Sequence, residues 1–209
     1  MAEPQQERAL QTRQALLLAA AETFDRYGYR GASVNRILRR AGLTAGALYF
    51  HFASKEELAR AVVGSLPDVA APWLESQGLQ RLVDITLVWA RRLQVDPLLR
   101  AGVRLANEWP PAGIGGDGPY RQWAAVMADC LLAAGERGEL APGVRPEEVA
   151  AFVAEACTGP HLVAAAAGGR DDPVERTVRM WRLLLPGIAT PGAAARTVVD
   201  PARVPLPAP

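Results

Sequence analysis

Helical periodicity, with almost no strand signal, is the feature that most limits what this chain can fold into. Apolar residues recur every three or four positions over most of the sequence, as they do on the buried face of a helix. No stretch alternates cleanly between apolar and polar residues with turn signals at both ends. Half of the 209 residues are hydrophobic, which is enough to bury a core. The sequence therefore predicts an all-α fold.

Capping residues divide the N-terminal part of the chain into short helices. A first helix over residues 7–27 should end at Gly28, because glycine readily adopts the left-handed conformation that closes a helix. Ser33 can accept a free backbone N–H at the start of a second helix over residues 34–41, which Gly42 would end. These two helices are predicted from local signals alone.

Two more caps follow after a tight turn. Thr44 opens a helix that reaches about Phe50. Ser54 opens a fourth helix, in which Glu57 at the third helical position completes a capping box by reaching back to the Ser54 amide. Two short helices that are joined by a tight turn and rest on a third are the elements of a helix-turn-helix DNA reader.

The overall net charge of +1 conceals a local excess of positive charge in this helical unit. Residues 1–66 contain nine Lys and Arg against six Asp and Glu, and the segment from Arg30 to Arg60 contains six against two. A basic surplus of this kind suits contact with the phosphates of a nucleic acid. The charge is suggestive of a DNA-binding surface without being decisive.

The helix that starts after Thr44 has the composition expected of a recognition helix. Its first residues are small and would let the backbone approach base edges in the major groove. These candidate base-reading residues are Thr44, Ala45, Gly46 and Ala47. Polar groups further along could hold phosphates, namely those of Tyr49, His51 and Lys55. The apolar side chains of Leu48, Phe50 and Phe52 are expected to pack inward. A plain packed hairpin, with Tyr49 and His51 at the edge of its core, explains the same periodicity equally well.

Residues 67–189 are predicted to form a larger helical domain. Amphipathic helices should cover residues 78–94, a segment that begins at Pro97, residues 120–140, an alanine-rich stretch that starts near residue 145, and residues 171–188. Gly159 and Pro160 interrupt the alanine-rich helix, where a kink or break is expected. Pro, Ala and Gly dominate residues 190–209, so we predict a disordered tail there.

Enzyme and membrane functions find no support in the sequence. It has no HExxH, GxSxG or P-loop motif, and the glycines of residues 113–118 follow no strand. Two histidines and two cysteines lie far apart, so no metal, cofactor or nucleophile site is expected, and Cys130 and Cys157 are predicted to be core residues. No apolar run could span a bilayer and the N-terminus is unlike a signal peptide, so we expect a cytoplasmic protein.

The segment from Thr12 to Val63 resembles the DNA-binding domain of the tetracycline-repressor (TetR) family. The resemblance rests on F-x-x-x-G-Y at residues 24–29, the Ala-Gly-Leu-Thr turn at 41–44, Leu-Tyr-Phe-His-Phe at 48–52 and Lys-Glu-Glu-Leu at 55–58. A weaker likeness to the γ-butyrolactone receptors, a subgroup of that family in antibiotic-producing bacteria, extends over residues 97–106, Trp123 and residues 180–188.

This resemblance implies a homodimeric repressor that binds a pseudo-palindromic double-stranded DNA operator and releases it when a small effector binds the C-terminal domain. It adds further candidate DNA contacts, namely Arg13, Ser33 and Arg36. It also places Trp123 against the ligand, a γ-butyrolactone or butenolide. The other candidate pocket residues are Val126, Met127, Trp89, Val103, Leu105, Phe152 and Thr158. Apart from Trp123, each is individually more often ordinary core.

Several features of the implied mechanism stay open at this stage. Thr158 and His161 could hydrogen-bond a polar part of the ligand, although a histidine satisfied elsewhere is the commoner case. The dimer interface is expected on the last two helices, with Ala164–Ala167 and the stripe that contains Trp181. The effector could instead be an antibiotic, a furan-type hormone or a protein partner.

The sequence also departs from the pattern of the family. Ala45 stands where the family usually has a lysine, which removes a contact to phosphate or base, and Arg39 and Arg40 could offset the lost charge. Pro160 falls in a ligand-domain helix where a continuous run is expected. Operator preference and the chemistry of the ligand pocket are therefore the properties in which we most expect this protein to differ from the family.

Overall fold

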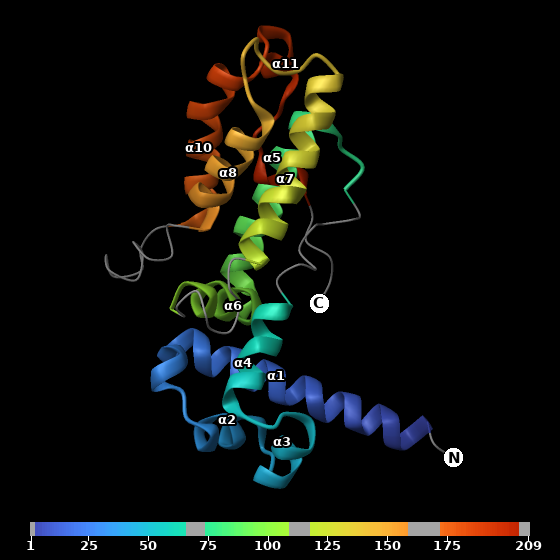
Figure 1. The fold of residues 1–209 in the computed structure, drawn as a ribbon, viewed down its shortest axis with the longest axis vertical. Helices are drawn as coiled ribbons and strands as arrows, with labels where there is room; N and C mark the ends of the chain where they lie inside the picture. Colours follow the sequence, from blue (N-terminus) through green and yellow to red (C-terminus); the bar gives the residue numbers. More distant parts are fainter. Residues whose placement is uncertain (1–2, 66–73, 109–117, 159–171, 205–209) are drawn as a thin grey trace. The chain divides into compact units, whose positions relative to one another are not determined.

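A computed structural model describes residues 3–65, 74–108, 118–158 and 172–204, which are helical in almost all of their regular structure (Figure 1). The described exception is a single antiparallel bridge between Leu140 and Ala189. The predicted all-α fold is therefore confirmed. Within these described ranges, no helix is long and apolar enough to cross a membrane.

The chain forms two compact units, and α6 (Pro97–Glu108) belongs to the first of them. Unit 1 comprises residues 1–66 and 96–119, and unit 2 comprises residues 67–95 and 120–209. This division after residue 66 coincides with the predicted boundary, whereas α6, which was expected in the domain of residues 67–189, lies in unit 1. The apolar face of α6 packs on α1 and α4, which are the N-terminal helices of unit 1.

The N-terminal helices of unit 1 begin and end at the predicted caps. They are α1 (Glu3–Gly31), α2 (Val34–Ala41), α3 (Ala45–His51) and α4 (Lys55–Gly64). The Ser33 hydroxyl accepts the Arg36 N–H at 3.3 Å, and Gly42 closes α2 with φ of 66°. The Thr44 hydroxyl accepts the Ala47 N–H at 3.3 Å. Local capping chemistry therefore positions the helix-turn-helix.

The capping box at the start of α4 differs in one detail from the prediction. The Glu57 N–H donates to the Ser54 hydroxyl at 3.1 Å, as expected. The Glu57 carboxylate, however, accepts the N–H of Ala53 at 2.6 Å rather than that of Ser54. The bond therefore fixes the chain one residue earlier, in the short link between α3 and α4.

The core of unit 1 takes one face of each helix, and it does not include Phe50. Leu48 and Phe52, one helical turn apart, are 0% and 2% exposed. Phe50, in contrast, is 80% exposed, so the expectation that it packs inward is wrong. The reason is geometric, because a residue two positions from Leu48 points to the opposite side of a helix.

Unit 2 is built around α5 (Gly78–Val95), which is buried on all sides from Leu82 to Ala90. The helices beside it are α7 (Gly118–Glu136), α8 (Pro146–Thr158) and α10 (Pro173–Ile188), as Figure 1 shows. Trp181 of α10 is fully buried, and its indole Nε1–H donates to the Thr86 hydroxyl of α5 at 2.7 Å. Trp181 is thus a core residue, which corrects its expected place in the dimer interface; Ala164–Ala167 lie outside the described residues.

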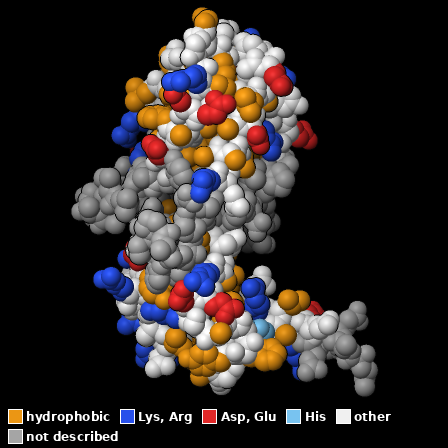
Figure 2. All heavy atoms as spheres, viewed as in Figure 1, with side chains coloured by type: hydrophobic (Ala, Val, Ile, Leu, Met, Phe, Trp, Pro, Cys, Tyr) orange, Lys and Arg blue, Asp and Glu red, His pale blue; other side chains and the backbone are white. Residues whose placement is uncertain are grey.

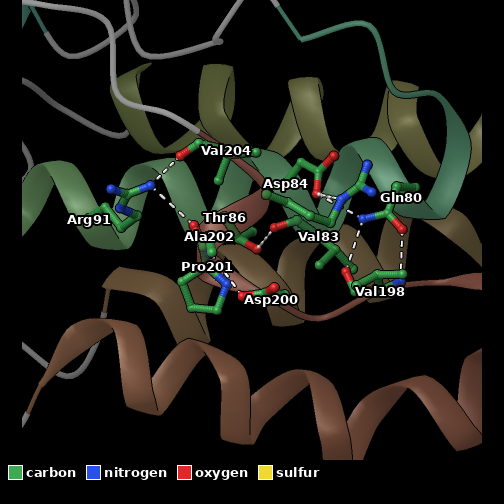
Figure 3. A network of polar contacts seen from close by, with 11 residues as sticks. Gln80, Val83, Asp84, Thr86, Arg91, Val198, Asp200, Pro201, Ala202 and Val204 are labelled. Carbon is green, nitrogen blue, oxygen red and sulfur yellow. Dashed lines mark hydrogen bonds and ion pairs between the residues drawn. The ribbon is translucent and has the colours of Figure 1, made fainter.

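The C-terminal segment is ordered as far as Val204, contrary to the predicted disordered tail. Residues 191–196 form α11 (Pro191–Arg196), and η2 (Pro201–Arg203) is a short 3₁₀ helix. Figure 3 shows the segment lying along α5, whose side chains hold it. The Gln80 amide donates to the Val198 carbonyl and accepts the Val198 N–H, at 3.0 and 2.8 Å. Arg91 donates to the carbonyls of Pro201 and Val204.

Both cysteines should resist thiol reagents in the folded protein. Cys130 and Cys157 are buried, and burial raises the pKa of the Cys157 thiol to about 12 and also raises the pKa of Cys130. The thiolate is the reactive form, so almost none is present near neutral pH. Titration with a chromogenic disulfide at pH 8 should detect no fast-reacting thiol in native protein and two in denaturant. Fast labelling of the native protein at either position would contradict the buried placement.

Candidate nucleic-acid interface and ligand site

The start of α3 presents a surface of small residues. Thr44, Ala45 and Gly46 are exposed and Ala47 is half-buried. A Cβ built on Gly46 would have only the Thr44 hydroxyl within 4 Å, at 3.9 Å, so Gly46 is not required by packing inside the chain. In Figure 2 hydrophobic side chains reach the surface at the foot of the view, where α3 lies, with Lys and Arg side chains close by. This end of the helix is open for another molecule.

Two aromatic residues extend this surface towards the end of α3. Tyr49 is 57% exposed and Phe50 is 80% exposed. The ring of Phe50 meets that of half-buried His51 edge-on, with 5.0 Å between ring centroids. Phe50 was not among the predicted site residues, although its position opposite Leu48 on the helix could have indicated it. An exposed phenylalanine beside small residues suits apolar contact, for example with a thymine methyl group.

Two of the predicted DNA-contacting arginines are held by aromatic rings. The Arg13 guanidinium lies 5.1 Å from the centroid of the Phe52 ring, and that of Arg36 lies 3.9 Å from the centroid of the Tyr27 ring. Such stacking lowers the entropy lost when an arginine makes a fixed contact. Ser33 is exposed at the start of α2, where its hydroxyl is used as the cap.

Lys55 has an internal role, which differs from the predicted phosphate contact. Its Nζ donates to the backbone carbonyls of Tyr29 and Ala32, at 2.9 and 3.0 Å. It also lies 4.2 Å from the centroid of the Tyr29 ring. Burial lowers the pKa of the Lys55 ammonium, although the backbone carbonyls and the ring surround the charge with negative potential. Lys55 therefore ties α4 to the end of α1.

A second candidate site lies in unit 2, where α5 and α7 bring two tryptophans together. The rings of Trp89 and Trp123 are stacked, with 4.7 Å between centroids and 26° between planes. The two side chains are 4% and 8% exposed. Their indole Nε1–H groups are both buried and have no hydrogen-bond partner among the described residues. A buried donor without an acceptor costs about 1–3 kcal/mol. A molecule that brought acceptor oxygens to this pair would remove that cost.

The other predicted pocket residues do not all gather at this pair. Met127, one turn after Trp123 on α7, is fully buried, and Val126 is half-buried. Val103 and Leu105 are buried in α6, and hence in unit 1. Phe152 is 52% exposed on α8, so in this structure it does not line a closed pocket. The Thr158 hydroxyl donates to the Ala154 carbonyl at 2.8 Å within its own helix. His161 lies outside the described residues.

Comparison with known proteins assigns the chain to a family. The profile of "Bacterial regulatory proteins, tetR family" matches residues 16–62, and that of "Tetracyclin repressor-like, C-terminal domain" matches residues 76–190. The chain belongs to the tetR family of bacterial regulatory proteins, which are DNA-binding transcriptional regulators and not enzymes.

Individual relatives narrow the comparison. The chain is 41% identical to the A-factor receptor protein of Streptomyces griseus over 190 residues, which cover 91% of this chain and 68% of that protein. It is similar to a crystal structure of a gamma-butyrolactone receptor (ArpA-like protein), with a TM-score of 0.76, 32% identity and coverage of 94% and 97% of the two chains. The same values describe its similarity to CprB of Streptomyces coelicolor in complex with its biological operator sequence.

Proposed function

We propose that the chain is a homodimeric repressor that leaves a pseudo-palindromic operator when a small γ-butyrolactone or butenolide binds unit 2. We further propose that it acts in the cytoplasm on genes of secondary-metabolite biosynthesis, antibiotics among them. The relatives described above support this proposal, since they include receptors for A-factor and γ-butyrolactones and a regulator bound to its operator. The single observation on this chain that carries it is the pair of unpartnered indole N–H groups of Trp89 and Trp123.

The tryptophan pair suits a flat, mostly apolar molecule with oxygen acceptors. A lactone ring offers carbonyl and ring oxygens that could accept indole N–H groups, and its alkyl part matches the neighbouring apolar side chain of Met127. Each new hydrogen bond would satisfy a buried donor that has no acceptor among the described residues of the free protein. Such a bond favours the liganded state more than a bond between groups that water satisfies before binding. This reasoning favours an oxygen-bearing hydrophobic effector over a charged one.

The proposed dimer uses α8 and α10, each of which carries an exposed large apolar side chain. Phe152 on α8 is 52% exposed and Leu183 on α10 is 77% exposed. Large apolar residues at these exposures on neighbouring helices are suited to burial against a second copy in a four-helix arrangement. Phe152, which we first expected in the ligand pocket, is therefore assigned to the interface in this proposal.

The dimer would couple ligand and DNA by a shift between two conformers. In one conformer the two α3 helices enter successive major grooves, and in the other their separation does not match the operator. An effector releases the DNA if it binds the second conformer more tightly than the first. Basic side chains around α3 supply phosphate contacts, so operator affinity should fall steeply with salt.

Tryptophan fluorescence tests this proposal most directly. An operator is first selected from a random duplex library with the wild-type protein. Synthetic γ-butyrolactones, butenolides and furan carboxylic acids are then titrated while emission and operator binding are followed. We expect lactones or butenolides to change the emission and to release DNA with the same midpoint. Release by the furan acids or by an antibiotic alone would reject the effector class, and failure to select any operator would reject the repressor itself.

A further inference from the structure

Tyr29 is the residue at which three helices of unit 1 meet. Gly28 breaks the helical path of α1, with φ of 67° and ψ of 178°, just before the last turn of that helix. The N–H of Tyr29, in the turn that follows this break, donates to the Glu108 carboxylate of α6 at 2.9 Å. A side chain from α6 thus acts as the cap of the last turn of α1.

The carbonyl of the same residue is held by α4. Lys55 Nζ donates to the Tyr29 carbonyl at 2.9 Å and to the Ala32 carbonyl at 3.0 Å. The Tyr29 ring lies under the Lys55 ammonium and stacks on Phe24, with 6.0 Å between the ring centroids. One residue is consequently bonded to α6 through its N–H and to α4 through its C=O.

Charged side chains attach α6 to both sides of the break. Arg104 donates to the Glu108 carboxylate and to the Asp25 carbonyl, each at 2.5 Å. Arg100 donates to the Asp25 carboxylate at 2.8 Å. These bonds fix α6 to the turn of α1 before Gly28, while Glu108 fixes it to the turn after. Any displacement of α6 must therefore be followed by this part of α1 or must break several charge-assisted bonds.

The chain enters α6 directly from unit 2. Among the described residues, the chain passes from unit 2 to unit 1 between Val95 and Asp96, at the end of α5, and returns to unit 2 between Pro119 and Tyr120, in α7. The Asp96 carboxylate accepts the N–H groups of Leu98 and Leu99 at 2.9 and 3.2 Å, so α6 begins immediately after it. The helix that carries Trp89 is thus followed, after one residue, by the helix that holds Tyr29.

We propose that Glu108 and Lys55 are positioning residues whose bonds to Tyr29 make α6, α1 and α4 move together and so set the separation of the two α3 helices. The inference rests on the proposed homodimeric DNA reader but not on the identity of its effector. It is chemically specific, because the transmitting contact is the peptide group of Tyr29 and not an apolar face. Loss of either bond should let α4, and with it α3, vary in position relative to α6.

Two substitutions remove the hydrogen bond between the Tyr29 N–H and the Glu108 carboxylate in different ways. Glu108→Ala removes the acceptor of the Tyr29 N–H. A Cβ built on Gly28 would lie 2.6 Å from both Glu108 carboxylate oxygens, so Gly28→Ala displaces the same carboxylate and adds strain at a positive φ. Glu108→Gln keeps a carbonyl acceptor at nearly the same place and serves as the conservative variant. Glu7→Ala is the control, because it removes an exposed carboxylate on α1 far along the helix from Gly28.

The inter-protomer distance between spin labels at Ala45→Cys reports the separation of the α3 helices without effector or DNA. The native cysteines are buried and should stay unlabelled. In the full-length homodimer we expect Glu108→Ala and Gly28→Ala to widen the distance distribution about twofold or to shift its mean, as expected when a two-state element loses a bond that fixes it. Glu108→Gln should widen the distribution less than Glu108→Ala does, and Glu7→Ala should give the same distribution as the parent protein.

The result that would overturn the proposal is a folded Glu108→Ala dimer, verified by circular dichroism, with the distance distribution of the parent protein. A merely structural role would lower the melting temperature and leave the distances unchanged. In the unlabelled protein, Glu108→Ala should also weaken operator binding about tenfold, within the usual range of coupling between sites. The double variant Gly28→Ala/Glu108→Ala should lose no more operator affinity than the single variant with the larger loss, since both substitutions remove the same contact.

Discussion

Trp89→Phe and Trp123→Phe should each raise the effector concentration needed for DNA release about tenfold, while the free protein keeps its operator affinity. Phenylalanine preserves an aromatic face for the stacked pair, but it removes the indole N–H and leaves a small void because its ring is smaller. Because that N–H has no partner within the described chain, the cost to the free protein comes from the void and not from a lost hydrogen bond. The liganded state would lose one hydrogen bond, about 1–1.5 kcal/mol, which corresponds to the tenfold change.

Trp181→Phe is the matched control for this pair. Its indole N–H already donates to the Thr86 hydroxyl at 2.7 Å, so the same substitution removes a buried hydrogen bond, although the hydroxyl keeps its own bond to the Val83 carbonyl. We expect a loss of about 1–3 kcal/mol in the free energy of unfolding and little change in effector sensitivity. Denaturant unfolding should show the larger effect for Trp181→Phe. Titrations of DNA release should show the larger effect for Trp89→Phe and Trp123→Phe. If Trp89→Phe and Trp123→Phe instead destabilise the protein and leave release unchanged, the pair is ordinary core and the site must be sought elsewhere.

Gly46→Ala should make the protein more stable and a much poorer DNA binder. Gly46 is exposed in α3 and does not have the left-handed φ that would need glycine, and a methyl group there meets open space. Alanine is favoured over glycine inside a helix by about 1 kcal/mol. The same methyl would stand on the surface that approaches base edges, where it separates the helix from the DNA. We expect about a tenfold or greater loss of operator affinity.

Gly64→Ala separates the two effects of that substitution. Gly64 ends α4, and a Cβ there also has no neighbour within 4 Å. This variant should gain stability as Gly46→Ala does and should bind the operator like the parent protein. Thermal unfolding and a fluorescence anisotropy titration on both variants suffice. Operator affinity unchanged in Gly46→Ala would show that the start of α3 does not approach the bases closely.

The parts of the fold that the sequence predicted are those set by local chemistry. Ser33, Thr44 and Ser54 each cap the helix that follows them, and Gly42 closes α2, because a cap needs only the few residues around it. The two tryptophans were predicted as ligand-site residues for a different reason. Trp123 was placed at the ligand by resemblance, and Trp89 was named as a possible neighbour, but their stacking and their unpaired N–H groups needed coordinates.

The errors concern contacts between residues far apart in the chain. Nothing near Lys55 indicates that its ammonium will bond to the carbonyl of Tyr29, 26 positions earlier. The amphipathic pattern of α6 shows that one face is buried but does not say which unit buries it. The misplaced Phe50 is the exception, because its helical position relative to Leu48 was available from the sequence and was not applied.

The segment along α5 in Figure 3 has a practical consequence for anyone who shortens this protein. The family profile ends at residue 190, and a recombinant chain trimmed to that limit would seem complete. Asp84, however, is only 2% exposed, and its carboxylate lies 3.5 Å from the guanidinium of Arg203. Trimming would leave a negative charge inside the central helix with Gln80 as its remaining partner. A shortened chain should therefore keep the residues up to Val204, and a fusion tag or protease site belongs beyond them.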